Sequence, residues 1–336
     1  MRFPIGLSTS LTAYIIRKRL ARERFIPLVL MLEPLFACNL TCSTCGRIRE
    51  YKDLASEMMS LDECLASADE CPAPIVSICG GEPLIYPRIV DLVESLTAMG
   101  KYIYLCTNGV RLASVVGKLN PSRRLQINVH IDGPPEVHDR LVEKDGAFED
   151  AFKGIIAASH RGFQITVNTT VCKQTDMNQI DALMDKLSHA GVSTFMLSPA
   201  YSYDSVESHE PFMDRNAVRE KFKNIDYLAS RHRLADSPIY LEYLKGRREL
   251  ECTAWGNPTR NVVGWRSPCY LVADQHFSRY SDLIEKTDWS SYGVGRDPRC
   301  KDCMVHCGFE PTAALMINKQ PGDIWKMLKW SLGFNI

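Results

Sequence analysis

Between about residues 28 and 198 the sequence alternates short apolar segments with longer amphipathic ones, and this alternation constrains the fold more than any other feature. The apolar segments predict strands at residues 28–32, 75–78, 102–106, 126–131, 164–170 and 194–198. The stretches between them predict helices at residues 61–69, 89–99, 112–119, 148–160 and 177–189. Strands separated by helices favour parallel βαβ units with right-handed crossovers. We therefore expect an α/β fold in which six units form a partial or complete barrel, with functional side chains at the carboxyl ends of the strands.

The regular pattern ends near residue 205, and this predicts three parts of the chain. Residues 1–26 form a helix that is apolar early and basic late, residues 27–205 form the barrel, and residues 206–336 form a C-terminal extension. Within the extension, about residues 252–314 are rich in Cys, Pro, Gly and Trp, and we interpret them as a separate metal-binding module. The basic helix suits peripheral contact with an anionic membrane, and equally suits packing of its apolar side on the barrel.

Charge and cysteine content limit the classes of function. The 40 basic and 40 acidic residues cancel, so no overall field favours a nucleic-acid partner. The 13 cysteines are an odd number in a chain without a signal peptide, which argues against a disulfide framework. No apolar run reaches the ~18 residues needed to cross a bilayer. We expect a cytoplasmic protein, with contact at the inner face of the membrane as an open option.

Three cysteines follow the first predicted strand with the spacing Cys38-x3-Cys42-x2-Cys45. Three thiolates on one loop are able to hold three irons of a [4Fe-4S] cluster and to leave the fourth iron open. A zinc site normally has four closed ligands, or three with a His, Glu or Asp nearby, and structural zinc or a chance spacing stays the alternative. Gly46 after the last cysteine lets the backbone wrap closely around a cluster.

Further motifs lie at the ends of successive predicted strands. They are Gly80-Gly81-Glu82-Pro83 after the second, Thr107 and Asn108 after the third, His130, Asp132 and Arg140 at and after the fourth, and Asn168 on the fifth. With the cysteine spacing, this order resembles the radical S-adenosylmethionine (SAM) superfamily. The resemblance implies a partial (β/α)6 barrel, a [4Fe-4S] cluster on Cys38, Cys42 and Cys45, SAM contacts by the motifs, and an electron donor such as flavodoxin or ferredoxin. A carboxylate at Glu82 suits the SAM ammonium group.

A second group of cysteines lies in the C-terminal extension. Cys252 and Cys269, followed by Cys300-x2-Cys303, resemble the auxiliary-cluster modules of many radical SAM enzymes. Four thiolates from two separated pairs suit a second [4Fe-4S] cluster or a tetrahedral zinc ion, and unligated thiols remain a third reading. Cys307 is a spare ligand or an unrelated thiol.

Longer strings resemble a narrower family, the adenosylhopane synthases of hopanoid biosynthesis. They surround Cys38, Cys106, Cys252, Cys269 and Cys303. This resemblance implies addition of the 5′-deoxyadenosyl radical to the terminal alkene of diploptene, an apolar triterpene, to give adenosylhopane. Cys106, at the end of the third strand, is the candidate thiol that quenches the product radical by donating hydrogen, and a buried core cysteine is the alternative.

Two other functions stay open. In the first, the radical abstracts hydrogen from a soluble glycoside or nucleoside and causes dehydrogenation, epimerisation or decarboxylation. In the second, the chain is a non-enzymatic iron–sulfur or zinc protein, which the motifs of strands two to five disfavour. Product analysis and SAM cleavage separate these readings.

Overall fold

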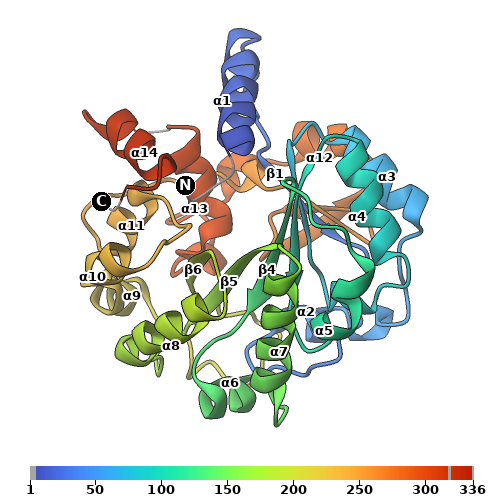
Figure 1. Ribbon diagram of the computed structural model, residues 1–336. Coiled ribbons are helices and arrows are strands. Elements are labelled where there is room, and N and C mark those ends of the chain that lie inside the picture. Colours follow the sequence, from blue (N-terminus) through green and yellow to red (C-terminus); the bar gives the residue numbers. More distant parts are fainter. Residues whose placement is uncertain (1–4, 317–318, 335–336) are drawn as a thin grey trace.

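The computed structural model describes residues 5–316 and 319–334, and its centre is a nine-stranded sheet (Figure 1). All six predicted strands are present, each within one residue of its predicted bounds. They are β1 (Val29–Glu33), β2 (Ile75–Ile78), β3 (Tyr102–Thr107), β4 (Leu125–His130), β5 (Gln164–Val171) and β6 (Thr194–Pro199). Neighbours pair in parallel in the order β6-β5-β4-β3-β2-β1, which confirms the α/β partial barrel.

Helices cross over between the strands and cover the outer face of the sheet (Figure 1). They are α2 (Gly46–Glu50), α3 (Leu61–Glu70), α4 (Ile89–Ala98), α5 (Leu112–Val115), α6 (Pro135–Val142), α7 (Ala147–His160) and α8 (Met177–His189). Ser60 and Glu63 form a capping box at the start of α3, and Asp176 caps α8. The helix predicted at residues 112–119 is divided into α5 and a 3-10 turn, because Gly117 and Pro121 disfavour a continuous helix.

The two faces of each strand differ in polarity. Because side chains alternate along a strand, Leu105 and Ile127 pack with the helices in the main core, while Cys106 and Asn128 face the barrel interior. Four further thiols, those of Cys64, Cys71, Cys79 and Cys172, are buried. The barrel interior therefore carries the polar and reactive groups.

The C-terminal extension joins the barrel sheet. β7 (Thr259–Asn261) pairs in parallel with β1, and β8 (Trp265–Pro268) and β9 (Ala273–Phe277) continue the sheet in antiparallel pairs. The predicted cysteine-rich module at about residues 252–314 thus shares the barrel sheet, and β7 covers the edge of β1 that would otherwise be unpaired. The helices of the extension are α9 (Arg215–Phe222), α10 (Ile225–Arg231), α11 (Pro238–Leu244), α12 (Tyr280–Lys286), α13 (His306–Ala314) and α14 (Asp323–Ser331).

The N-terminal helix α1 (Ile5–Leu20) projects from the body of the molecule (Figure 1). It ends six residues before the predicted end at residue 26, and Arg22 just beyond it has a left-handed backbone (φ 57°) that a helix does not continue through. Tyr14 packs with Ile26, Leu28 and Leu315, so one apolar side of the helix lies on the domain. Within residues 5–316 and 319–334, no helix is long and apolar enough to span a membrane.

Candidate active site

The first cysteine loop lies at the carboxyl end of β1, between that strand and α2. Cys38 and Cys42 contact an apolar wall of Leu40, Val142 and Ala147, and all three cysteines of the loop are half-buried. On the far side, Arg49 Nη1 donates to the backbone carbonyls of Cys42 (2.8 Å) and Cys45 (2.9 Å). The Arg49 side chain thus holds the main chain of the loop at two of its three cysteines.

Burial keeps the thiols of Cys38 and Cys42 protonated when no metal is bound. It raises the pKa of Cys38 to about 11, and it raises the pKa of Cys42 further, with the neighbouring thiols adding to both shifts. Metal binding releases these protons, so a cation of high charge is what stabilises the thiolates. A donor set of three sulfurs beside an apolar wall fits a [4Fe-4S] cluster with one open iron.

Glu82 is fully buried and its carboxylate is used inside the protein. Oε1 accepts hydrogen bonds from the Thr107 hydroxyl (2.7 Å) and the Leu84 amide (2.9 Å), and Oε2 accepts one from the Asn108 amide (2.8 Å). Burial raises the pKa of Glu82 although these hydrogen bonds oppose the shift. These hydrogen bonds join the end of β2 to the end of β3, and the contact of this carboxylate with the SAM ammonium group stays a prediction.

The two glycines before Glu82 allow the backbone of this loop to lie against the chain that leads into Cys38. Gly80 has φ +108°, and a Cβ there would meet the Leu35 carbonyl at 2.5 Å. A Cβ on Gly81 would overlap the carbonyl of Ala37. Only glycine fits both positions, so the motif sets the distance between the β2 loop and the first cysteine loop.

Asn108 brings the β3 motif to the same place. Its Nδ2 donates to Asn39 Oδ1 (2.8 Å) and lies 3.9 Å from Cys38 Sγ. Thr107 and Asn108, predicted from separate motifs, therefore lie with Glu82 and Cys38 in one group.

The β4 and β5 motifs form a second polar group at the mouth of the barrel. His130 Nε2 lies 2.7 Å from Asp132 Oδ2, and Asn168 Nδ2 lies 3.4 Å from His130 Nδ1. Burial lowers the pKa of His130, but the Asp132 carboxylate outweighs burial and the net shift is upward. Arg140 is exposed on α6, outside this set of hydrogen bonds.

Cys106 lies on the interior side of β3, as predicted. Its Sγ is 3.3 Å from Ser77 Oγ and 3.6 Å from Asn128 Nδ2. Burial raises the pKa of Cys106, so the group is a neutral thiol that carries its hydrogen at neutral pH.

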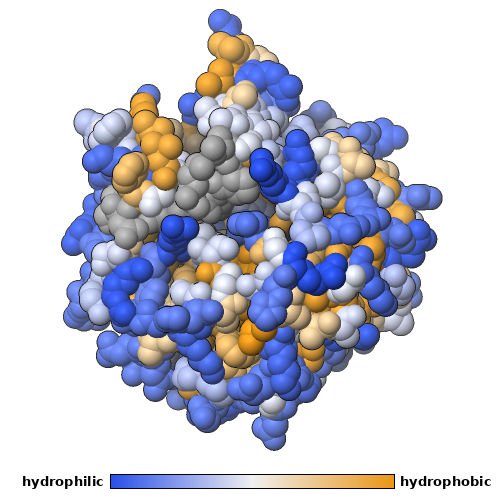
Figure 2. Space-filling view, in the orientation of Figure 1, coloured by the Kyte–Doolittle hydropathy of each residue, from blue (hydrophilic) through white to orange (hydrophobic). Residues whose placement is uncertain are grey.

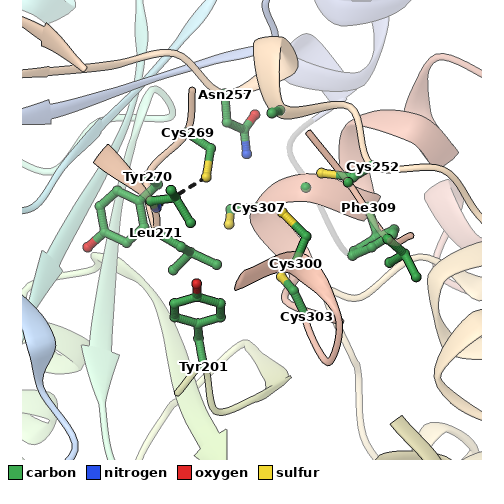
Figure 3. Close-up of a pocket in the computed structure, with 15 residues that line it drawn as sticks. Tyr201, Cys252, Asn257, Cys269, Tyr270, Leu271, Cys300, Cys303, Cys307 and Phe309 are labelled. Carbon is green, nitrogen blue, oxygen red and sulfur yellow. Dashed lines mark hydrogen bonds between the residues drawn. The ribbon is translucent and has the colours of Figure 1, made fainter. Parts of the chain in front are cut away.

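The second group of cysteines lines a cavity between the barrel and the C-terminal helices (Figure 3). The cavity encloses about 490 Å³ not filled by protein atoms, part of it open to solvent, and its wall is largely apolar. The cysteines on this wall are Cys252, Cys269, Cys300, Cys303 and Cys307. Tyr201 and Asn257 complete the lining near the sulfurs. Five thiols around one cavity fit a bound metal group, and burial raises the pKa of all five.

Among the described residues, no group of three or more His, Cys, Asp or Glu side chains is arranged to hold a single metal ion. Sequence reasoning also missed the buried Glu33, Arg47 and Arg266, which lie between the two cysteine sites. A charged residue that ends a buried strand, as Glu33 does, and an arginine directly after the Cys45-Gly46 pair are signals that were present but not used.

Two successive parts of the chain are similar to known protein families. Residues 32–187 match the radical SAM superfamily, and residues 195–327 match a domain of unknown function, DUF3463. The AdoMet-dependent heme synthase of Methanosarcina barkeri is 30% identical over 192 residues, which cover 55% of each chain. The pre-heme d1 synthase of Dinoroseobacter shibae is 26% identical over 278 residues, which cover 77% of this chain and 68% of that protein.

A solved structure agrees on the fold. Native anSMEcpe with bound AdoMet superposes with a TM-score of 0.57 at 14% identity, over 91% of this chain and 97% of that one. The chain matches only about half of the heme synthase's length, and none of these three relatives is named as a hopanoid enzyme. The narrower resemblance therefore rests on the sequence strings alone.

The radical SAM match places the three-cysteine loop, the glycine motif and the strand-end motifs within one domain, and such a domain implies a [4Fe-4S] cluster and SAM as cofactors. The three half-buried thiols beside an apolar wall fit that cluster. Residues 32–187 therefore form a radical SAM domain, and a DUF3463 domain follows it at residues 195–327.

Proposed function

We propose that this enzyme adds the 5′-deoxyadenosyl group to the alkene of a hopene such as diploptene and gives adenosylhopane. The observation that carries the proposal is the neutral thiol of Cys106 in the barrel interior, held by Ser77 and Asn128. An addition reaction leaves a carbon radical on the product, and that radical needs a hydrogen atom. A thiol is a suitable donor because its S–H bond is weaker than an alkyl C–H bond.

The chain's own residues hold and orient the cofactors in this proposal. Cys38, Cys42 and Cys45 would ligate the cluster, which with bound SAM supplies the 5′-deoxyadenosyl radical after one-electron reduction by a flavodoxin or ferredoxin. The backbone at Gly80 and Gly81 lies against the chain that leads into Cys38, and this close approach would fix the β2 loop beside the cluster. The proposed polar contacts of SAM lie at or near the strand ends and include Asn108, His130, Asp132 and Asn168.

The direct test is anaerobic reconstitution with SAM, a strong reductant and diploptene, followed by mass spectrometry. An adduct with the mass of diploptene plus deoxyadenosyl plus one hydrogen supports the proposal. Free 5′-deoxyadenosine with unchanged diploptene contradicts it and leaves the radical SAM assignment in place.

A pair of cysteine variants tests the hydrogen donor. Cys106→Ala should retain SAM cleavage and addition but fail to give the normal reduced product. Cys172→Ala is the matched control, because Cys172 is also a buried thiol (1% exposed) but lies beyond the end of β5. An unchanged product profile in Cys106→Ala removes this thiol from the mechanism.

The cavity lined by five cysteines is proposed to hold a second [4Fe-4S] cluster, with zinc as the alternative. The ligands would be Cys252, Cys269, Cys300 and Cys303, and Cys307 also reaches the cavity wall. Iron, sulfide and zinc analysis of wild type and of Cys300→Ala decides between the metals. A second cluster predicts a loss of about four irons per chain, since a cubane contains four.

Contact of α1 with a membrane surface is proposed from its projecting end. Ile16 and Leu20 are 53% and 80% exposed in the last two turns of α1, next to Arg17 and Arg19, and Figure 2 shows apolar and hydrophilic residues side by side on the projecting helix. An exposed apolar tip with cations suits anionic lipid headgroups. Wild type should co-sediment with phosphatidylglycerol vesicles and Leu20→Asp should not, while Met99→Asp, at another exposed apolar residue, should behave as wild type.

Hydrogen abstraction from a soluble glycoside or nucleoside is the second candidate, and one observation favours it. Asn128 Oδ1 is buried in the barrel without a hydrogen-bond partner among the described residues. A hydroxyl of a polar substrate would satisfy this acceptor, whereas an alkene would not. Release of 5′-deoxyadenosine as the main product, without an adenosyl adduct, is the outcome expected for this function.

A further inference from the structure

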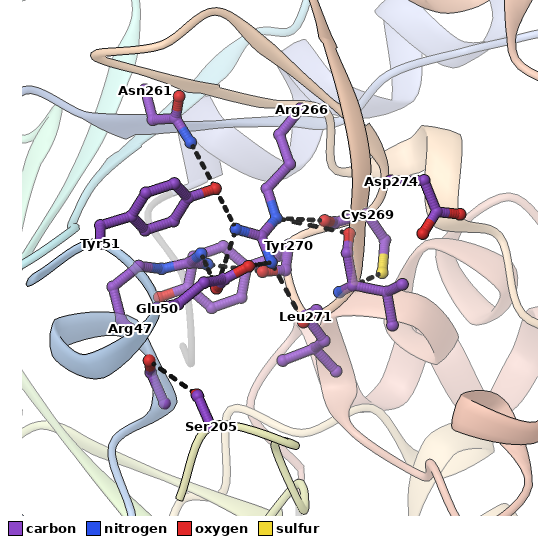
Figure 4. Close-up of polar contacts among 12 residues, drawn as sticks. Arg47, Glu50, Tyr51, Ser205, Asn261, Arg266, Cys269, Tyr270, Leu271 and Asp274 are labelled. Atoms are coloured by element: carbon purple, nitrogen blue, oxygen red, sulfur yellow. Dashed lines mark hydrogen bonds and ion pairs between the residues drawn. The ribbon is translucent and has the colours of Figure 1, made fainter. Parts of the chain in front are cut away.

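Two arginines and a glutamate lie between the first cysteine loop and the loop that carries Cys269 (Figure 4). Arg47 is in α2, two residues after Cys45, and Arg266 is in β8. Their side chains are 3% and 0% exposed. Glu50 contacts both guanidinium groups, at 3.2 Å from Arg47 Nη1 and 3.1 Å from Arg266 Nη1.

These two guanidinium groups bind all four backbone carbonyls of residues 269–272. Arg266 donates to three of the carbonyls, and Arg47 donates to the fourth. The donor–acceptor distances are 3.0 Å at Cys269, 2.5 Å at Tyr270, 3.1 Å at Leu271 and 3.4 Å at Val272. Planar guanidinium groups with five donors suit such a set of carbonyls, and lysine cannot replace them. The path of this loop, and the position of the Cys269 sulfur, therefore depend on both arginines.

The same helix also holds the first cysteine loop. Arg49 binds the carbonyls of Cys42 and Cys45, and Arg47 Nε lies 2.8 Å from Glu33 Oε1 at the end of β1. Glu33 is fully buried. Helix α2 thus contacts both cysteine sites, through Arg49 on one side and Arg47 on the other.

The network is balanced in charge, with Glu33 and Glu50 opposite Arg47 and Arg266. Removing one member of a buried network leaves an uncompensated charge, so its members move together rather than separately. A shift of the loop at residues 269–272 would displace Arg47, and with it the start of α2 and Cys45.

We propose that Arg47, Glu50 and Arg266 form a brace that couples the two cysteine sites, so that metal in the second cavity sets the geometry of the first loop and its affinity for SAM. The inference rests on the metal group proposed for the second cavity and is independent of the alkene substrate. The brace residues are positioning residues, because they hold main chain and other side chains. Coupling of this kind is a difference in binding free energy and is measured as one.

The test measures the dissociation constant of SAM by equilibrium dialysis on the anaerobically loaded full chain, so turnover is not the readout. Cys300→Ala/Cys303→Ala empties the cavity without changing the loop at residues 269–272. With the brace intact, this change should weaken SAM binding about tenfold, which corresponds to about 1.4 kcal/mol. In the Glu33→Gln/Arg47→Met background, where two charges of the network are removed together, the same cavity change should alter SAM binding less than twofold.

A second variant disrupts the brace by another change and keeps the test valid if Glu33→Gln/Arg47→Met does not fold. Glu50→Gln removes the charge between the arginines and should give the same loss of coupling, and Arg88→Met, at an exposed arginine paired with Asp91, should leave the coupling intact. The EPR spectrum of the reduced first cluster should change with SAM in every variant that binds it.

Three results would overturn the brace. The first is that Cys300→Ala/Cys303→Ala changes SAM affinity equally with and without the brace. The second is that this change leaves SAM affinity unaltered when the brace is intact. The third is that the wild-type cavity takes up no metal. Failure of the alkene-addition proposal looks different, because it changes the products and leaves these SAM affinities as they are.

Discussion

Glu82→Ala tests whether the carboxylate of the glycine motif is used inside the protein or by a ligand. The change removes the acceptor of two buried main-chain amides, those of Leu84 and Asn108. Each buried donor left unsatisfied destabilises the fold by about 1–3 kcal/mol, so the two together should lower the free energy of unfolding by about 2–6 kcal/mol. The Thr107 hydroxyl also loses its acceptor, but it can rotate, so we assign it no share of this loss in the free energy of unfolding.

Glu82→Gln separates charge from hydrogen bonding. Its amide oxygen can still accept on one side, but its NH2 group then faces a donor, so one hydrogen bond is lost and the expected change is about 1–3 kcal/mol. Urea unfolding followed by circular dichroism should therefore rank wild type above Gln and Gln above Ala.

The opposite result has a clear meaning. If Glu82→Ala stays within about 1 kcal/mol of wild type, the amides have other acceptors and our account of Glu82 as an internal link is wrong. A large loss of SAM affinity with unchanged stability would then support the predicted contact between the Glu82 carboxylate and the SAM ammonium group.

Three further predictions follow from the site and its surroundings. Cys38→Ala should abolish SAM cleavage, measured as 5′-deoxyadenosine, and retained cleavage would contradict the first cluster. Gly81→Ala should destabilise the protein by about 1–3 kcal/mol because its Cβ overlaps the Ala37 carbonyl; normal thermal unfolding would refute this. Burial raises the pKa of Glu310 to about 7. Since this folded-state pKa lies above the unfolded one, the protonated Glu310 carboxyl stabilises the protein at acid pH, and this stabilisation is lost as pH rises through 7. Between pH 6 and pH 8, the free energy of unfolding of Glu310→Gln should therefore rise by about 1 kcal/mol relative to that of wild type, as measured from urea unfolding midpoints.

The six strands and the positions of the motifs were predictable because each depends on local sequence. A short apolar run between amphipathic segments fixes a strand to within one residue, and a parallel sheet brings the carboxyl ends together. The groups at Cys38, Glu82, Thr107 and Asn108 are therefore found next to one another, as their order along the chain indicates.

Long-range pairing was not predictable from the sequence in the same way. β7 has only three residues and no periodicity, and its partner β1 precedes it by more than 200 positions. The contact between Arg47 and the Tyr270 carbonyl spans a similar separation. Each depends on tertiary packing of polar groups, which hydrophobic periodicity does not describe.

The orphan acceptor on Asn128 offers a test of substrate class. Its Nδ2 holds the Cys106 sulfur, while Oδ1 faces the barrel interior without a partner among the described residues. Under the addition proposal only the thiol contact matters, so Asn128→Leu should keep the KM for diploptene and change the fraction of reduced product. Under hydrogen abstraction from a glycoside or nucleoside, a substrate hydroxyl would bind Oδ1, and its loss should raise the KM of that substrate about 10-fold or more.

Ser77→Ala is the matched control, because Ser77 also contacts the Cys106 sulfur. If the thiol is the hydrogen donor, Ser77→Ala and Asn128→Leu should shift the product ratio in the same direction, because each removes one hydrogen-bond partner of the same sulfur. A change in the KM for diploptene with Asn128→Leu, and none with Ser77→Ala, would mean that Asn128 touches the substrate itself. That result would contradict an account in which Asn128 acts only through the thiol, since a buried amide oxygen gains nothing from contact with hydrocarbon.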